Sequence, residues 1–311
     1  MTRRRDYARS LKLPGYWGFT LAVLKVLKEN KKALLYLGLV YAIASVVFLG
    51  LGSQENFDTL RETVNNTGGE VFQGNWGEVG KASLLALSTI AGNISPELTE
   101  VQQVYAVVLG LIIWLSTVWL LRQRLAGNKV GVRDALYNGG APIVATAILF
   151  LVMLVQLLPL ALAIIGYTAA QTSGLLAGGV EAMLFWIAAI GLAVLSLYWI
   201  TSTFMAMVIV TLPGMYPFRA LSIAGDMVVG RRLRIMYRIL WAFLLQIVMW
   251  LVVLIPIVLL DAGLKQVLPA VSWIPIVPVV LVILSTTSLI TMASYVYLLY
   301  RRVVDDDAKP A

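Results

Sequence analysis

Five arginines within residues 218–238 are the side chains whose type and spacing most resemble a binding site. The stretch reads FRALSIAGDMVVGRRLRIMYR and carries Arg219, Arg231, Arg232, Arg234 and Arg238. A guanidinium donates paired hydrogen bonds to phosphate, so this cluster could contact an anionic lipid headgroup. The alternative is a basic belt that only orients the chain in a membrane, with the long side chains reaching the interface. We favour the second interpretation.

The glycines of this stretch do not form a phosphate-binding loop. Gly225 and Gly230 enclose DMVV, and no GxxxxGK[ST] motif is present. Residues 218–234 instead alternate apolar and basic positions at helical spacing, which predicts an amphipathic helix lying at the membrane interface. We expect the two glycines to permit a bend between this helix and the following span.

Several classes of chemistry are excluded by residue type. The chain has no Cys and no His, which removes disulfides, thiol nucleophiles, Cys/His zinc sites and imidazole acid–base catalysis. Ionisable residues are also nearly absent from the apolar runs. The polar side chains deep in these runs include the amides of Gln156 and Gln246, which do not ionise, so no proton relay is visible. We therefore expect no catalytic residue, no metal site, no cofactor and no enzymatic activity.

The elements that position these side chains follow from composition. Of 311 residues, 60% are hydrophobic and 13% charged, and the mean hydropathy is +0.86. This composition is typical of a multi-pass membrane protein. The apolar runs are long enough to cross a ~30 Å hydrocarbon core. They predict an all-α integral membrane protein with six transmembrane helices, at about 34–52, 104–121, 141–166, 181–211, 239–261 and 276–300.

The predicted domain organisation has three parts. Residues 1–33 form a basic cytoplasmic N-terminal segment, residues 34–300 form the six-helix membrane domain, and residues 301–311 form a cytoplasmic tail. Residues 53–103 form an outer loop, in which we expect a surface helix at 83–92 and a helix start at Ser95-Pro96-Glu97.

The distribution of positive charge predicts the orientation. If both termini are cytoplasmic, all but three of the 24 Lys and Arg residues lie on the cytoplasmic side, the exceptions being Arg61, Lys81 and Lys265. Cytoplasmic loops of membrane proteins carry such an excess. We expect a protein of the plasma (inner) membrane with both termini inside.

A weak internal repeat links the predicted hairpins. VRDALYNGGAP at 132–142 and PFRALSIAGDM at 217–227 share an Arg, an Ala-Leu pair and a downstream Gly. Each leads into an apolar run interrupted by proline, at Pro159 and at Pro256. We infer three units of one orientation, each a cytoplasmic interfacial helix followed by a two-helix hairpin.

Hydroxyl side chains in two of the runs leave two interpretations. Ser196, Thr201, Ser202 and Thr203 lie in the fourth run, and STTS at 285–288, Thr291 and Ser294 lie in the sixth. They could line a small polar cavity, but hydroxyls commonly serve close packing and hydrogen bonding between membrane helices. We favour packing.

The stretch ALSIAGDMVVGRRLRIMYRILWAFLLQIVMWLVVLIPIVLL, at 220–260, resembles a segment of bacterial multi-pass proteins that are similar to the membrane domain of glycerophosphodiester phosphodiesterases. This stretch is the clearest part of the resemblance, which is topological and extends loosely to the rest of the chain through the hairpin arrangement. It implies a bacterial inner-membrane module. It does not imply a hydrolase, because the catalytic barrel of those enzymes uses His and acidic metal ligands, whereas this chain has no His and no room for a barrel.

Two functions remain open from the sequence. One is a non-enzymatic scaffold or accessory subunit of the bacterial cell envelope. The other is a transporter or binder of lipids or small amphiphiles, which predicts a membrane-open cavity with lipid near Arg231, Arg232 and Arg234. The expected partners are membrane lipids, including those with anionic headgroups, and other membrane proteins or further copies of the chain. Nucleic acid is not expected.

Overall fold

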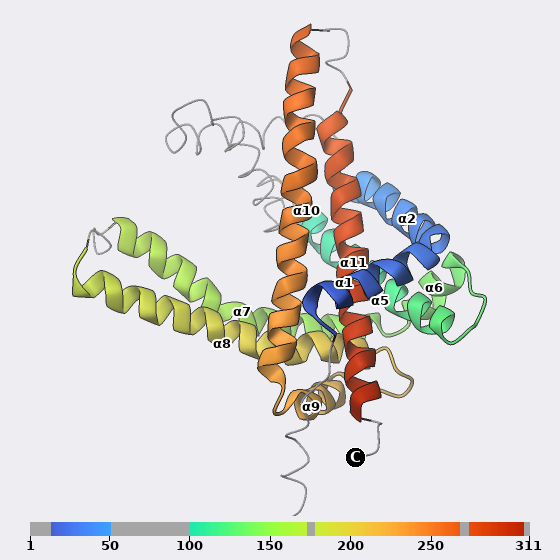
Figure 1. The fold of residues 1–311 in the computed structure, drawn as a ribbon, viewed down its shortest axis with the longest axis horizontal. Helices are drawn as coiled ribbons and strands as arrows, with labels where there is room; N and C mark the ends of the chain where they lie inside the picture. Colours follow the sequence, from blue (N-terminus) through green and yellow to red (C-terminus); the bar gives the residue numbers. More distant parts are fainter. Residues whose placement is uncertain (1–13, 51–99, 173–177, 268–273, 308–311) are drawn as a thin grey trace, which may run out of the picture. The chain divides into compact units, whose positions relative to one another are not determined.

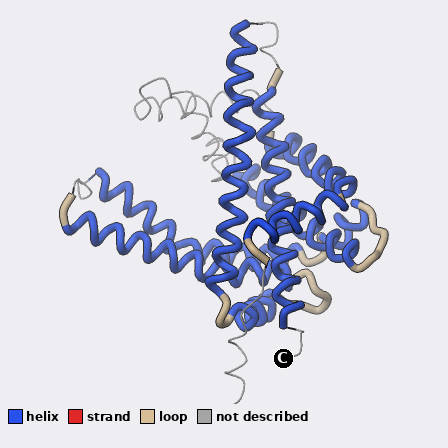
Figure 2. The backbone as a smooth tube through the Cα atoms, in the orientation of Figure 1, coloured by secondary structure: helices blue, strands red, loops and turns tan. Residues whose placement is uncertain are grey.

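Helices account for almost all of the chain that the structure describes. This computed structural model describes residues 14–50, 100–172, 178–267 and 274–307, and these ranges contain no strand (Figure 2). The helices, labelled as in Figure 1, are α1 (Tyr16–Glu29), α2 (Lys31–Leu49), α5 (Glu100–Leu125), α6 (Val132–Gly139), α7 (Ile143–Thr172), α8 (Val180–Ile209), α9 (Pro217–Val228), α10 (Arg232–Val267) and α11 (Ile276–Asp307).

Six of these helices are long and apolar enough to cross a membrane, which confirms the predicted fold class. Their membrane-compatible parts are Lys31–Leu49, Glu100–Leu125, Ile143–Tyr167, Val180–Ile209, Arg232–Asp261 and Ile276–Asp305. The predicted surface helix at 83–92 and the helix start at 95–97 lie outside the described residues.

The predicted interfacial helix at 218–234 is in fact divided. Helix α9 ends at Val228, and α10 begins at Arg232, so Arg232 and Arg234 already belong to the long helix. Gly230 forms the break with a φ of +76°, which an L side chain rarely adopts. Gly225 lies inside α9 and makes no bend, so only one of the two glycines plays the predicted part.

The chain forms two compact units. The first comprises residues 1–23, 141–240 and 295–311, and the second comprises residues 24–140 and 241–294. Helices α1, α10 and α11 each contribute to both units, whereas the other six described helices belong to one unit each.

In the second unit, α6 packs across α5 and also contacts α2, as Figure 1 shows. Leu37, Ile113, Leu120 and Ala135 are buried together where these helices meet. Gly139 makes the closest approach, since a Cβ there would lie 3.0 Å from the Cα of Ser116. The absent side chain therefore permits the contact between α6 and α5.

The second unit also contains facing parts of α10 and α11. Trp250 and Leu254 of α10 form a buried cluster with Val277 and Leu284 of α11. The indole N–H of Trp250 donates a hydrogen bond of 2.7 Å to the Oγ of Ser288. An apolar side chain with a polar tip thus joins the two helices both by packing and by a specific bond.

In the first unit, α7 and α8 form a long antiparallel hairpin, and α9 packs mainly on α8 (Figure 1). Two interhelical hydrogen bonds hold the hairpin: Leu160 N donates to Ser196 Oγ at 3.1 Å, and Thr203 Oγ1 donates to Gln156 Oε1 at 2.6 Å. The first bond directly follows Pro159, which interrupts the helical hydrogen bonding of α7.

The hydroxyl groups of α8 and α11 are engaged within the helical framework. Thr201, Thr286, Thr287, Thr291 and Ser294 each donate to a carbonyl four residues earlier in the same helix. Together with the bonds of Ser196, Thr203 and Ser288 across helix pairs, this agrees with the packing interpretation of these hydroxyls.

Each short helix packs against a pair of long helices. Helix α6 contacts α5 and α2, and α9 contacts α8 and α7. Helix α1 meets α10 and α11 through its first two turns, where the Phe19 ring lies edge-on to the Tyr295 ring at 4.9 Å and near the guanidinium of Arg238. The short helix that packs against α10 and α11 is thus α1, which lies near the start of the chain.

Candidate functional site

The basic segment, residues 217–238, consists of α9, a turn and the first two turns of α10, all in the first unit. Pro217 occupies the first position of α9, where a missing N–H costs nothing. Ala220, Ala224 and Val228 form the buried face of α9, spaced four residues apart. This apolar face seats α9 on the α7–α8 hairpin and leaves its other side exposed.

Two of the predicted headgroup ligands point outward. Arg219 of α9 and Arg234 of α10 are both exposed, whereas Arg231 in the turn is half-buried. The Nε of Arg231 donates to the carbonyl of Met227 at 3.2 Å, which closes the end of α9. Only part of the predicted cluster is therefore placed to meet an external anion directly.

Arg232 is directed onto α8. Its Nη2 donates to the Oγ of Ser202 at 2.9 Å, and its guanidinium carbon lies 4.2 Å above the centre of the Tyr198 ring. Tyr198 and Ser202 are one turn apart on α8, so both reach the same guanidinium. The charge of Arg232 is stabilised by a π face and a hydroxyl, and it fastens the start of α10 to α8.

Arg238 is buried, with 6% of its surface exposed. Its guanidinium carbon lies 4.7 Å from the centre of the Tyr16 ring and 5.5 Å from that of Phe19, and its Nη2 donates to the carbonyl of Pro14. Among the described residues, no acidic side chain forms an ion pair with it. We call this arrangement the Arg238 cage. Its contacts join the start of α1 to α10.

The five arginines therefore do not act as one cluster. Arg232 and Arg238 hold helices together, Arg231 bonds its own turn, and Arg219 and Arg234 remain exposed. The sequence pattern found the basic segment but could not separate these uses, because burial of an arginine depends on partners far away in the chain.

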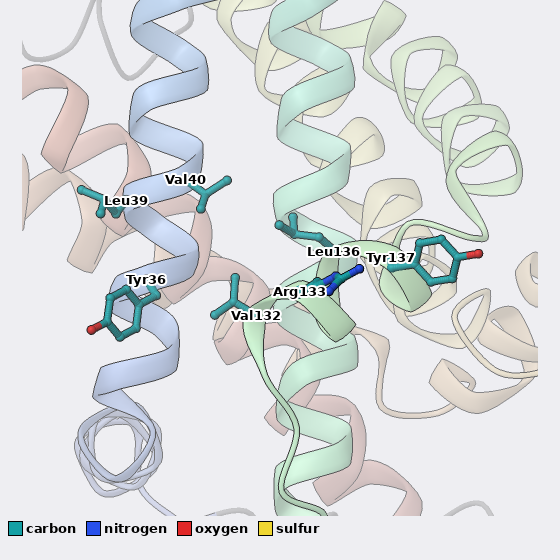
Figure 3. Close-up of a pocket in the computed structure, with 7 residues that line it drawn as sticks. All are labelled: Tyr36, Leu39, Val40, Val132, Arg133, Leu136 and Tyr137. Atoms are coloured by element: carbon teal, nitrogen blue, oxygen red, sulfur yellow. The ribbon is translucent and has the colours of Figure 1, made fainter.

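A groove in the second unit was not recognised from the sequence. It lies between α2 and α6, has a volume of about 770 Å³, and is lined by Tyr36, Leu39, Val40, Val132, Arg133, Leu136 and Tyr137. In Figure 3, Val40 of α2 and Val132 and Leu136 of α6 point into the space between the helices, while Tyr137 extends away from α2. The sequence signal for the groove is VRDALYNGG, whose basic and apolar positions also fit the repeat shared with residues 217–227.

No metal centre is apparent in the part of the chain that the structure describes, since it contains no group of three or more carboxylate, His or Cys side chains placed to hold an ion. Comparisons of the chain with protein-family models, with curated proteins and with solved structures found no match.

Proposed function

We propose that this chain is a non-enzymatic scaffold or accessory subunit of the bacterial inner membrane, with both termini in the cytoplasm. The six spans and the distribution of Lys and Arg support this assignment. The resemblance of residues 220–260 to bacterial multi-pass proteins supports it as well.

The main support for this proposal is that polar side chains in the spans form hydrogen bonds between helices. Ser196, Gln156 and Thr203 join α7 to α8, Trp250 and Ser288 join α10 to α11, and Arg232 joins α10 to α8. These groups stabilise a helical framework through bonds that replace water in an apolar medium. A framework of this kind can present its outer surfaces to partner proteins, and this role requires no polar pathway for a solute through the membrane.

The test is reconstitution of the purified full chain into liposomes. We expect the rates of lipid scrambling and of solute release to equal those of protein-free liposomes, and we expect no turnover of labelled phospholipid. In membranes extracted without detergent exchange, the chain should be found in a complex of defined stoichiometry, with itself or with a second polypeptide. Lipid movement or lipid turnover by the purified chain would contradict the scaffold assignment.

The second candidate function is binding or transport of lipids or small amphiphiles, and the groove between α2 and α6 favours it. The groove combines aliphatic walls with a guanidinium, which suits a molecule with an apolar chain and an anionic group. Lipid scrambling in the same liposome assay would support transport, whereas binding without movement would be compatible with a scaffold.

A further inference from the structure

We propose that the groove between α2 and α6 binds one anionic phospholipid of the surrounding membrane, with the lipid phosphate at Arg133 and one acyl chain along α2. The groove lies wholly in the second unit and contains none of the arginines of the basic segment. The proposal rests on the membrane location of the chain, and it holds whether the chain is a scaffold or a transporter.

The walls of the groove are apolar on both sides. Val40 of α2 lies opposite Val132 and Leu136 of α6 (Figure 3), Leu39 also lines the groove, and the volume of the groove is about 770 Å³. Polar solutes would lose hydrogen bonds to water on entering such a space, whereas an acyl chain loses none. The volume lies within the range of small-molecule sites.

The apolar surface continues along α2 beyond the groove. Ile43 and Val47 are exposed and follow Tyr36 and Val40 at helical spacing, so they extend the same face of the helix. From Tyr36 to Val47 the helix rises about 16 Å, which is about one leaflet of a ~30 Å hydrocarbon core. A single acyl chain could therefore lie against α2 for its whole length.

Two cations lie at or beside the groove: Arg133 is one of its lining residues, and Lys32 belongs to the first turn of α2. Arg133 is exposed on α6, and Lys32 lies one turn before Tyr36 and so on the same side of α2. The nearby carboxylate of Asp134 accepts a 2.9 Å hydrogen bond from the N–H of Gly131 and caps α6. Arg133 and Lys32 are thus complementary to a phosphate held at the interface.

A phospholipid is the occupant that uses both features. Free phosphate would contact Arg133 and Lys32 but leave the aliphatic walls uncovered. A second copy of the chain could cover the walls with an apolar helix but would leave the two cations without a phosphate. The combination of two cations with aliphatic walls beside one span therefore favours a lipid with an anionic headgroup.

The experiment is native mass spectrometry of the full chain in detergent, titrated with phosphatidylglycerol or with phosphatidylcholine of the same acyl chains. We expect one tightly bound phosphatidylglycerol per chain. Arg133→Gln should weaken that binding about tenfold, because a charge-assisted hydrogen bond to phosphate is lost. Arg302→Gln is the matched control, since Arg302 is an exposed arginine of α11 outside the groove, and it should leave the affinity nearly unchanged.

A second pair of variants tests the apolar part without changing charge. Val40→Trp fills the groove and should weaken binding of both lipids, whereas Leu35→Trp changes an exposed residue of the same helix that does not line the groove and should have little effect. Circular dichroism and gel filtration confirm that each variant is folded.

Three outcomes would overturn the proposal. Arg133→Gln and Arg302→Gln could weaken binding equally, which would show only general attraction to charge. Glycerol phosphate without acyl chains could compete as well as the lipid, which would show a phosphate site. Val40→Trp could instead dissociate a dimer, which would show that a second copy fills the groove. The liposome assay of scaffold function has a separate readout, so failure of either proposal can be recognised independently.

Discussion

The guanidinium carbon of Arg238 lies 4.7 Å from the centre of the Tyr16 ring, although Tyr16 belongs to α1, the first described helix, and Arg238 belongs to α10. The contact is reinforced by Phe19, whose ring meets the Tyr295 ring edge-on, and by the carbonyl of Pro14. Attraction to the aromatic faces and the hydrogen bond to the carbonyl offset part of the hydration that the buried guanidinium loses. The Arg238 cage therefore holds the first turns of α1 against α10 and α11.

Replacement of Arg238 should release α1. Arg238→Gln loses both ring contacts and the hydrogen bond to Pro14, which we expect to cost about 1–3 kcal/mol in the docking of α1. Because the chain has no Cys, a single Val23→Cys reporter on the buried face of α1 can be labelled with a maleimide. Labelling should accelerate in Arg238→Gln.

Arg234→Gln is the matched control for this measurement, since Arg234 lies one turn earlier on α10 and is exposed. Labelling of Val23→Cys should be unaffected by it. Arg238→Lys should give an intermediate rate, because an ammonium keeps the charge but not the planar guanidinium that stacks on the rings. Equal rates in all three backgrounds would show that the cage does not hold α1.

The interhelical bonds of the α7–α8 hairpin should each contribute to stability. Ser196→Ala removes the acceptor for Leu160 N, and Thr203→Ala removes the donor to Gln156. Each change should lower the free energy of unfolding by about 0.6 kcal/mol and by no more than about 1.7 kcal/mol, the average and the maximum for such bonds in membranes. Unfolding in mixed micelles with increasing dodecyl sulfate measures the change.

Thr201→Ala provides the control for the hairpin, because Thr201 bonds only the carbonyl of Leu197 in its own helix. Its effect on unfolding should be smaller than that of either interhelical change. A loss as large as that in Thr203→Ala would mean that hydroxyls on α8 stabilise the helix itself and not the hairpin.

Because α6 approaches α5 closely at Gly139, any side chain at position 139 should destabilise the contact between the two helices. In Gly139→Ala the new Cβ would lie 3.0 Å from the Cα of Ser116 and 3.2 Å from the Cβ of Trp119. We expect a destabilisation of about 1–3 kcal/mol, typical of overpacking. Gly110→Ala on α5 meets no atom within 4 Å, so it should be neutral or stabilising by up to about 1 kcal/mol. The same unfolding assay compares the two variants, and equal behaviour would refute the role of Gly139.

The orientation of the chain can be tested with two further single-Cys reporters. Lys129→Cys lies between α5 and α6, and Glu181→Cys lies at the start of α8. With both termini inside, a membrane-impermeant maleimide added to intact cells should label position 181, and position 129 only after the membrane is opened. The reverse pattern would invert the proposed topology.

Part of the candidate site was predictable from the sequence. The basic segment and its amphipathic helix are predictable because the spacing of apolar residues is a local property of the chain. The structure then decides which apolar residues are buried: Ala220, Ala224 and Val228 are, whereas Phe218 is exposed. The end of α9 was misplaced because residues 229–231 contain only one strong helix breaker, and the left-handed conformation of Gly230 ends α9 six residues before the predicted end.

The groove between α2 and α6 was not predictable in the same way. Its lining combines residues 36–40 with residues 132–137, which are almost a hundred positions apart. Each group alone looks like an ordinary helix surface in a membrane protein. Only the packing of α6 on α5 and α2, made possible at Gly139, brings the groups together.

The sequence by itself determined that this is a helical membrane protein with six spans, because hydropathy and run length decide whether a segment can leave water. The tertiary structure alone decided which arginines are exposed and which hold helices together. The physical reason is that a guanidinium can be buried only where rings, hydroxyls or carbonyls replace part of its lost contacts with water. The carbonyl that does this for Arg238 belongs to Pro14, 224 positions away in the chain.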